Sequence, residues 1–241
     1  GPTWRETFAP PTATPKSEPT TPWWQKRRDE ILGVSSNSTP AYIYNVPTLI
    51  SNAQALTAMG NVDRVFYAMK ANPNPDILKV IHSQSLGSAW VSPGEPQRVR
   101  SLFPDLETQR LLFTPNFAPR SEYEIGFALG AMVTLDNIHP LRAWPEVFAG
   151  KEILVRVDPG QGRGHHQHVR TAGARSKFGV SVEELPEFAR LAQSAGARVV
   201  GLHAHAGSGV LTPGAWASTG LFLAGMLELF PDVRSMDLGG G

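Results

Sequence analysis

Residues 65–84 read VFYAMKANPNPDILKVIHSQ and contain the signals of one strand followed by one helix. Val65–Met69 is an apolar and aromatic run, which favours a buried strand. Asn74 and Pro75 then form a helix start, because asparagine caps the free N–H groups and proline suits the first turn. The stretch therefore predicts a strand, a short turn and a helix over Pro75–Gln84.

The same alternation of strand and helix continues along most of the chain. Strands are expected at Ala41–Asn45, Val65–Met69, Ser88–Val91, Arg110–Thr114, Ala131–Leu135, Glu152–Val157, Val199–His205 and Ser235–Leu238. Helices are expected at Thr48–Met59, Pro75–Gln84, Pro96–Leu102, Ser121–Leu129, Val182–Ala195 and Ala215–Leu229. Ser181 and Glu184 have the spacing of a capping box, which marks the start of the fifth of these helices.

Repeated strand–helix units predict a parallel sheet, because parallel strands need a crossover connection. A doubly wound sheet and a β/α barrel both meet this requirement, but no G-x-G-x-x-G follows the first strand, which disfavours the dinucleotide-binding fold. About seven strands follow the one at Ala41–Asn45, roughly one fewer than a closed eight-stranded barrel needs. We therefore predict the α/β class and an incomplete (β/α)8 TIM barrel.

The first part of the chain has a different composition. Proline recurs among threonine and serine over residues 1–40, which disfavours a long helix or a central strand. We interpret 1–40 as a linker or N-terminal extension with a short helix at Trp23–Gly33, and 41–241 as the barrel domain. Tryptophans at positions 4, 23 and 24 suggest that the extension docks on a folded neighbour.

Charge and cysteine content exclude several functional classes. The 22 Lys+Arg and 21 Asp+Glu residues give a formal charge of +1, without the basic excess that nucleic acid or an anionic membrane attracts. We therefore expect no nucleic-acid or membrane partner. The sequence has 0 Cys, which excludes disulfides, thiolate metal sites and cysteine nucleophiles. Together these features favour a soluble protein of the cytoplasm.

Lys70 is the first candidate for chemistry, since it directly follows the apolar strand Val65–Met69. Active sites of β/α barrels lie at the carboxyl ends of the strands. Apolar surroundings favour the neutral amine of a lysine, which is the form that attacks a carbonyl group. The alternative is a solvated or salt-bridged lysine at a strand end.

Two glycine-rich segments form the second candidate region. In 201–209 (GLHAHAGSG), His203 and His205 face the same side of a strand, and a turn that exposes backbone N–H groups follows. No carboxylate or third histidine accompanies them in the strand, so an imidazole facing a flat ligand beside a phosphate-accepting turn is favoured over a metal site. The alternative is a pair of packed barrel-lining histidines. Ser235–Gly241 ends in three glycines that suit an anion, or else form a flexible terminus.

A long polar insertion, Gly160–Gly179, follows the strand that carries Arg156. Its His165, His166 and His168 are too closely spaced in a loop to complete a tetrahedral site readily. We predict no metal site.

Taken in order, these segments resemble the fold-type III pyridoxal-phosphate (PLP) enzymes, a group of alanine-racemase-like barrels. The matching pieces are YAMKAN, a G-x-x-x-x-S-x-G-E segment at Gly87–Glu95, RVDP, SKFG, HAHAGSG and MDLGGG, spread over about Ala41 to Gly241. RTAGARSKFG and HAHAGSG are most similar to diaminopimelate decarboxylases. GQGRGHHQHV and WWQKRRDE resemble the bacterial form fused behind an aspartate kinase.

The resemblance implies PLP as cofactor and decarboxylation of meso-2,6-diaminopimelate to L-lysine, in a homodimer, with an aspartate kinase domain as a possible N-terminal partner. It implies that Lys70 carries PLP as a Schiff base and that His205 stacks on its ring. The other implied cofactor-binding residues are Ala68, Arg156, Ser208, Gly239, Gly240 and Gly241. The alternatives are a decarboxylase of ornithine, lysine or arginine, and a PLP-binding barrel without turnover.

Two departures from the family pattern carry expectations of their own. Ala89 stands where the family usually has an acidic residue that supports the cofactor site. The family's E-P-G-R strand, and the β-domain that completes the site across a dimer interface, do not occur in the 241 residues. We therefore expect the isolated chain to be inactive.

Overall fold

The computed structural model describes residues 21–36, 39–92, 94–160, 177–210 and 212–240. It divides into two compact units, 1–51 and 52–241, with the division inside helix α4 (Val46–Thr57). The boundary expected between residues 40 and 41 stays a prediction.

The first unit contains two short helices, α2 (Trp23–Lys26) and α3 (Arg28–Ser35), neither of which has a buried residue. The single helix predicted over Trp23–Gly33 is therefore wrong in its bounds, because it is interrupted at Arg27 and continues beyond Gly33. Docking of the tryptophans stays a prediction for Trp23 and Trp24, and Trp4 lies outside the described residues.

The strand predicted at Ala41–Asn45 is also wrong. These residues have no strand assignment and lead directly into α4. The side chain of Asn45 accepts hydrogen bonds from the N–H (3.0 Å) and the hydroxyl (2.7 Å) of Thr48. Asn45 therefore caps the start of α4, so the apolar run before it leads into a helix and does not form a strand.

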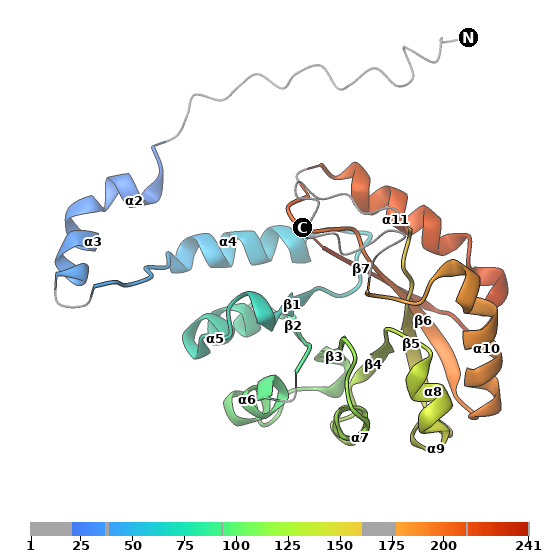
Figure 1. Cartoon of the computed structure of the whole chain (residues 1–241). Coiled ribbons are helices and arrows are strands. Elements are labelled where there is room, and N and C mark those ends of the chain that lie inside the picture. The colour runs from blue at the N-terminus through green and yellow to red at the C-terminus, as the bar shows by residue number, and fades with distance from the viewer. Residues whose placement is uncertain (1–20, 37–38, 93, 161–176, 211, 241) are drawn as a thin grey trace, which may run out of the picture. The chain divides into compact units, whose positions relative to one another are not determined.

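The second unit contains a parallel sheet of seven strands in the order β1-β2-β3-β4-β5-β6-β7 (Figure 1). The strands are β1 (Phe66–Ala68), β2 (Gly87–Trp90), β3 (Leu111–Phe113), β4 (Met132–Leu135), β5 (Glu152–Arg156), β6 (Arg198–His205) and β7 (Ser235–Gly239). In the described part of the chain each strand pairs with the next one along the sequence, and the sheet curls into a half-barrel. The predicted incomplete α/β barrel is confirmed.

Helices cover the outer side of the curled sheet (Figure 1). They are α5 (Pro75–Ser83), α6 (Gly94–Leu102), α7 (Arg120–Ala128), α8 (His139–Ala143), α9 (Pro145–Phe148), α10 (Leu185–Ser194) and α11 (Gly214–Ala224). Short 3-10 turns lie at η1 (Met69–Ala71), η2 (Thr108–Arg110), η3 (Val182–Glu184) and η4 (Leu227–Leu229). No helix among the described residues is long and apolar enough to cross a membrane.

Both predicted helix starts are confirmed. The Asn74 side chain accepts from the N–H of Asp76 at 2.9 Å, and Ser181 with Glu184 forms a capping box. The sequence prediction missed α8 and α9, since these helices are only 5 and 4 residues long and a proline lies in the first turn of each.

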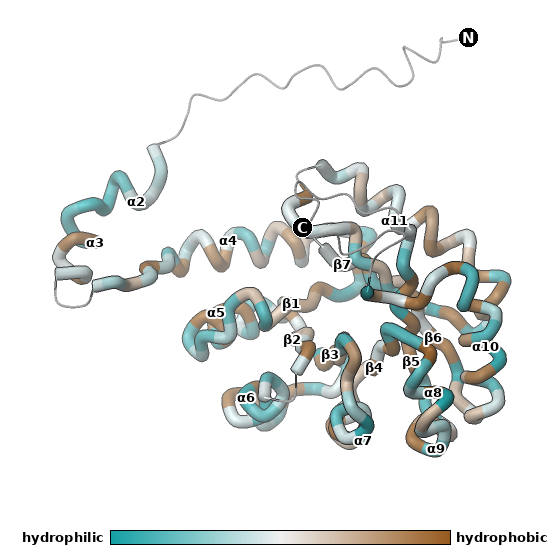
Figure 2. The backbone as a smooth tube through the Cα atoms, viewed as in Figure 1, coloured by the Kyte–Doolittle hydropathy of each residue, from teal (hydrophilic) through white to brown (hydrophobic). Residues whose placement is uncertain are grey.

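The core lies between the sheet and its helices, and strands β3 to β6 are coloured mostly as hydrophobic in Figure 2. Four large aromatic side chains contact one another in sequence. Trp90 stacks on Phe113 at 5.7 Å between ring centroids, Phe113 meets Tyr123 edge-on at 6.0 Å, and Tyr123 meets Phe148 edge-on at 5.5 Å. These residues come from β2, β3, α7 and α9, so their packing fixes the helices on the sheet.

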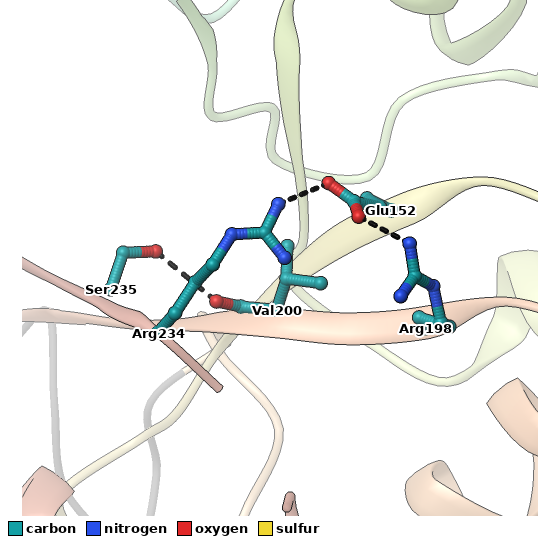
Figure 3. Close-up of polar contacts among 5 residues, drawn as sticks. All are labelled: Glu152, Arg198, Val200, Arg234 and Ser235. Atoms are coloured by element: carbon teal, nitrogen blue, oxygen red, sulfur yellow. Dashed lines mark hydrogen bonds and ion pairs between the residues drawn. The ribbon is translucent and has the colours of Figure 1, made fainter. Parts of the chain in front are cut away.

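Polar contacts hold together the amino ends of the last three strands (Figure 3). Glu152, at the start of β5, pairs with Arg198 at the start of β6 and with Arg234 just before β7. The hydrogen bond from Arg234 is the main reason that the pKa of Glu152 is lowered. The Ser235 hydroxyl donates to the Val200 carbonyl at 3.2 Å. These ion pairs lie at the amino ends of the strands, opposite to the carboxyl ends that carry Arg156 and His205.

Candidate active site

Several of the predicted site residues lie together at the carboxyl ends of the strands. Arg156 of β5 pairs with His203 of β6. Two residues further along β6, His205 pairs with Gly239 of β7. Lys70 is exposed in η1, the turn that directly follows β1. The positive charge of Lys70 is one of the causes that lower the pKa of His205, so the Lys70 side chain lies within electrostatic range of that ring.

His205 is held in its neutral form. Burial is the largest cause that lowers its pKa, followed by the positive charges of Arg156 and Lys70, and the result is a pKa of about 4. At neutral pH the imidazole therefore carries no charge, and its flat face is suited to contact with an aromatic ligand.

Arg156 is a buried cation, 9% exposed, at the end of β5. Its Nη1 donates to the Asn116 side-chain oxygen at 2.8 Å, and its guanidinium lies 5.0 Å from the centre of the Phe178 ring. Burial lowers the pKa of Arg156, while the carboxylates of Asp136 and Asp237 act in the opposite direction. The side chain is therefore fixed from several strands at once.

The carboxyl ends of β6 and β7 meet in a turn made of glycines. The Ala206 N–H donates to the Gly239 carbonyl at 2.8 Å. Gly240 has φ +116°, and a Cβ there would lie 2.8 Å from the Gly207 carbonyl oxygen. Only glycine permits this approach, and it brings the backbone of both strand ends next to the exposed Ser208.

The structure does not place Ala68 in this cluster, nor several of the other predicted residues. Ala68 ends β1, is exposed, and pairs with Ala89 of β2. Gly241 lies outside the described residues, as do His165, His166 and His168. Among the residues that the structure describes, no three His, Cys, Asp or Glu side chains gather as a metal site. His203 instead has Asp237 as its neighbour, with 2.7 Å between Nδ1 and Oδ2.

Sequence reasoning missed the carboxylates and the amide that surround Arg156. Asp136, 1% exposed at the end of β4, accepts from the Phe117 N–H at 3.2 Å and from the Asn137 side chain at 2.8 Å. Burial is the main cause that raises the pKa of Asp136. An acid directly after the apolar strand Met132–Leu135 was the available signal. The carboxylates whose charges act on Arg156 follow β4 (Asp136) and β5 (Asp158) or lie in β7 (Asp237), whereas β2 carries Ala89.

This arrangement defines a class: an α/β half-barrel with an exposed lysine, a neutral histidine and a glycine turn around one space. The chain belongs to the pyridoxal-dependent decarboxylases. The family profile described as "Pyridoxal-dependent decarboxylase, pyridoxal binding domain" matches residues 49–241. The cofactor of this family of domains is PLP.

The curated relatives that this chain matches include two diaminopimelate decarboxylases. The diaminopimelate decarboxylase of Methanothermobacter thermautotrophicus is 36% identical over 180 residues, which are 73% of this chain and 42% of the relative. That of Escherichia coli K12 is 28% identical over 204 residues, 84% of this chain and 48% of the relative. The chain thus spans less than half the length of these relatives.

Solved structures support the fold. Diaminopimelate decarboxylase from Helicobacter pylori, complexed with L-lysine, has a TM-score of 0.73 at 24% identity, over 87% of this chain and 55% of that one. Lysine/ornithine decarboxylase from Vibrio vulnificus, complexed with putrescine, has a TM-score of 0.70 at 20% identity, over 88% of this chain and 56% of that one.

The residues present fit PLP. The backbone at Gly207 and Gly240 leaves no room for a Cβ on Gly240, so bare peptide groups line the turn, as an anionic phosphate requires. The neutral ring of His205 suits a pyridine ring, and the exposed Lys70 amine can reach an aldehyde.

Proposed function

We propose that this chain is the PLP-binding half-barrel of a diaminopimelate decarboxylase, which converts meso-2,6-diaminopimelate to L-lysine. The single observation that supports it most is that His205 meets the glycines at the ends of β6 and β7, within electrostatic range of Lys70. The relatives in the family with 36% and 28% identity that carry the name diaminopimelate decarboxylase favour this substrate.

Each residue of the cluster has a role in this proposal. Lys70 attaches the cofactor aldehyde, and His205 covers one face of the ring. Ser208, Gly239, Gly240 and Gly241 hold the phosphate, with Ala68 at the border of the site. PLP, when bound, supplies an electron sink that stabilises the carbanion left by departing CO2.

Arg156 is placed to act on the ring without giving up its proton. Its guanidinium is anchored by Asn116 at 2.8 Å, and the charges of three carboxylates act on it, those of Asp136, Asp158 and Asp237. A guanidinium remains charged throughout the ordinary pH range, so this side chain keeps a fixed positive charge beside His205. The same charge helps to keep His205 neutral.

Reductive trapping tests the attachment site. Purified protein is incubated with PLP, reduced with borohydride and digested, and the labelled peptide is identified by mass spectrometry. We expect the label at Lys70, its loss in Lys70→Ala, and its retention in the matched control Lys79→Ala on the exposed face of α5. A label at any other lysine would overturn the assignment.

A panel of amino acids tests the substrate. Assayed in the full-length protein and not in the isolated 241 residues, CO2 release is expected from meso-2,6-diaminopimelate in preference to ornithine, lysine and arginine. Preferential release from one of the latter three would support the alternative decarboxylases. PLP binding by the full-length protein without CO2 release from any of them would support a barrel without turnover, which Ala89 permits. Inactivity of the isolated chain, the homodimer, the aspartate kinase partner and the cytoplasmic location stay predictions.

A further inference from the structure

His203 is the conspicuous side chain of β6 to which the proposed function gives no task. It lies two residues before His205 on the same strand and is buried, with 8% of its side chain exposed. The register places Arg156, His203 and Asp237 side by side on β5, β6 and β7. His205 and Gly239 form the next pair on the same face of the sheet, two residues nearer the strand ends.

Asp237 gives His203 a partner that His205 does not have. Its Oδ2 lies 2.7 Å from the His203 Nδ1, and its side chain is 28% exposed. Burial alone would raise the pKa of Asp237, but attraction to His203, His205 and Arg156 outweighs burial and lowers the pKa. The carboxylate therefore stays charged at neutral pH and lies in close contact with the His203 ring on the side of β7, without the geometry of a hydrogen bond.

The His203 ring in turn contacts the start of the glycine turn. A Cβ built on Gly239 would lie 3.1 Å from the His203 Cε1 and 3.4 Å from the His205 Nδ1. The backbone of Gly239 thus rests directly against both imidazoles. Gly240 follows at φ +116° and closes on Gly207, so the place of Gly239 decides where the turn lies.

We propose that Asp237 is a positioning residue that acts through His203, fixing its imidazole against Gly239 and thereby the glycine turn that receives the cofactor phosphate. This inference rests on the proposed function, in which Gly239 and Gly240 hold that phosphate. In this proposal His203 supports the backbone of Gly239, whereas His205 on the same strand face contacts the cofactor ring.

The affinities for PLP and for pyridoxal, which lacks the phosphate, test the proposal in the purified protein. In Asp237→Asn and in His203→Gln we expect PLP to bind about tenfold more weakly, as is usual when a supporting partner is lost. Binding of pyridoxal is expected to stay unchanged, because the turn contacts only the phosphate. The visible circular dichroism of bound PLP is expected to change as the ring loses its fixed orientation.

Glu152→Gln is the matched control, because it removes a carboxylate at the opposite end of the same strands. It is expected to leave both affinities unchanged. The double variant Asp237→Asn/His203→Gln is expected to bind PLP no more weakly than either single variant, because both changes break one path.

Three results overturn the inference: unchanged PLP affinity in Asp237→Asn, equal weakening of PLP and pyridoxal, or additive losses in the double variant. Equal weakening would mark Asp237 as merely structural. If the unsubstituted protein fails to bind PLP at all, the proposed function itself is refuted, which is a distinguishable outcome.

Discussion

Replacing Gly240 with alanine is the sharpest test of the contact between the turn that follows β6 and the turn that follows β7. The added Cβ would lie 2.8 Å from the Gly207 oxygen and 3.1 Å from the nitrogens of Ala206 and Gly207. All three are backbone atoms, so the overlap cannot be relieved by rotating a side chain. The residue also sits at φ +116°, a conformation that L-residues with a side chain avoid.

Two costs add in this variant. A positive φ destabilises a residue that has a Cβ by about 1–2 kcal/mol. Overlap in a tightly packed place costs about 1–3 kcal/mol more. We therefore expect Gly240→Ala to lower the free energy of unfolding by about 2–5 kcal/mol, the sum of these two ranges. PLP binding should weaken as well, since the turn must open.

Gly150→Ala is the matched control, because Gly150 has φ +70° but no neighbouring atom within 4 Å of an added Cβ. It should cost only the conformational part, about 1–2 kcal/mol. Urea denaturation gives both free energies of unfolding, and a PLP titration gives the affinities. Equal destabilisation of the two variants, with unchanged PLP binding in Gly240→Ala, would refute the close approach of the two turns.

Three further predictions concern stability. Tyr123→Phe should raise the free energy of unfolding by about 1 kcal/mol in thermal or urea denaturation, because the buried Tyr123 hydroxyl has no hydrogen-bond partner; a loss of stability would contradict this. Asn74→Ala should lower the free energy of unfolding by about 1 kcal/mol, because it removes the cap of α5. The control is Asn61→Ala in a loop before β1, and equal losses in the two variants would argue against the cap. The pKa of His205 is lowered to about 4, so between pH 6.5 and about 4 the unfolded chain binds a proton that the folded chain does not. The stability that His205 contributes is therefore fully present above pH 6.5 and is lost as the pH falls from 6.5 through about 4. Unfolding measured across this range should show a shallower loss in His205→Gln, and an identical slope would contradict the assignment.

The fold was largely predictable because its strands are short apolar runs bounded by clear helix starts. Phe66–Ala68 and Leu111–Phe113 lie inside the predicted ranges, and Asn74 caps as expected. The apolar pattern of Ala41–Asn45 predicts a strand, whereas the capping hydrogen bond that the Thr48 N–H donates to the Asn45 side chain depends on the backbone path.

The site was predictable only where a residue's place follows from the strand that carries it. Lys70 and His205 come directly from strand ends, so position alone indicated them. The contact of Arg156 with Asn116 joins residues 40 positions apart, and no local pattern encodes it. The same holds for Asp237 and His203, whose adjacency results from the register between β6 and β7.

The pairing of every strand with its neighbour in the sequence has a consequence for how the protein is made. Phe66 of β1 pairs with Gly87 of β2, and even the long connection from β5 to β6 joins Glu152 to Arg198. The strands therefore leave the ribosome in the same order in which they stand in the sheet. Because the glycine turn lies on the last two strands, the capacity to hold a ligand arises only when synthesis of this sheet is nearly complete.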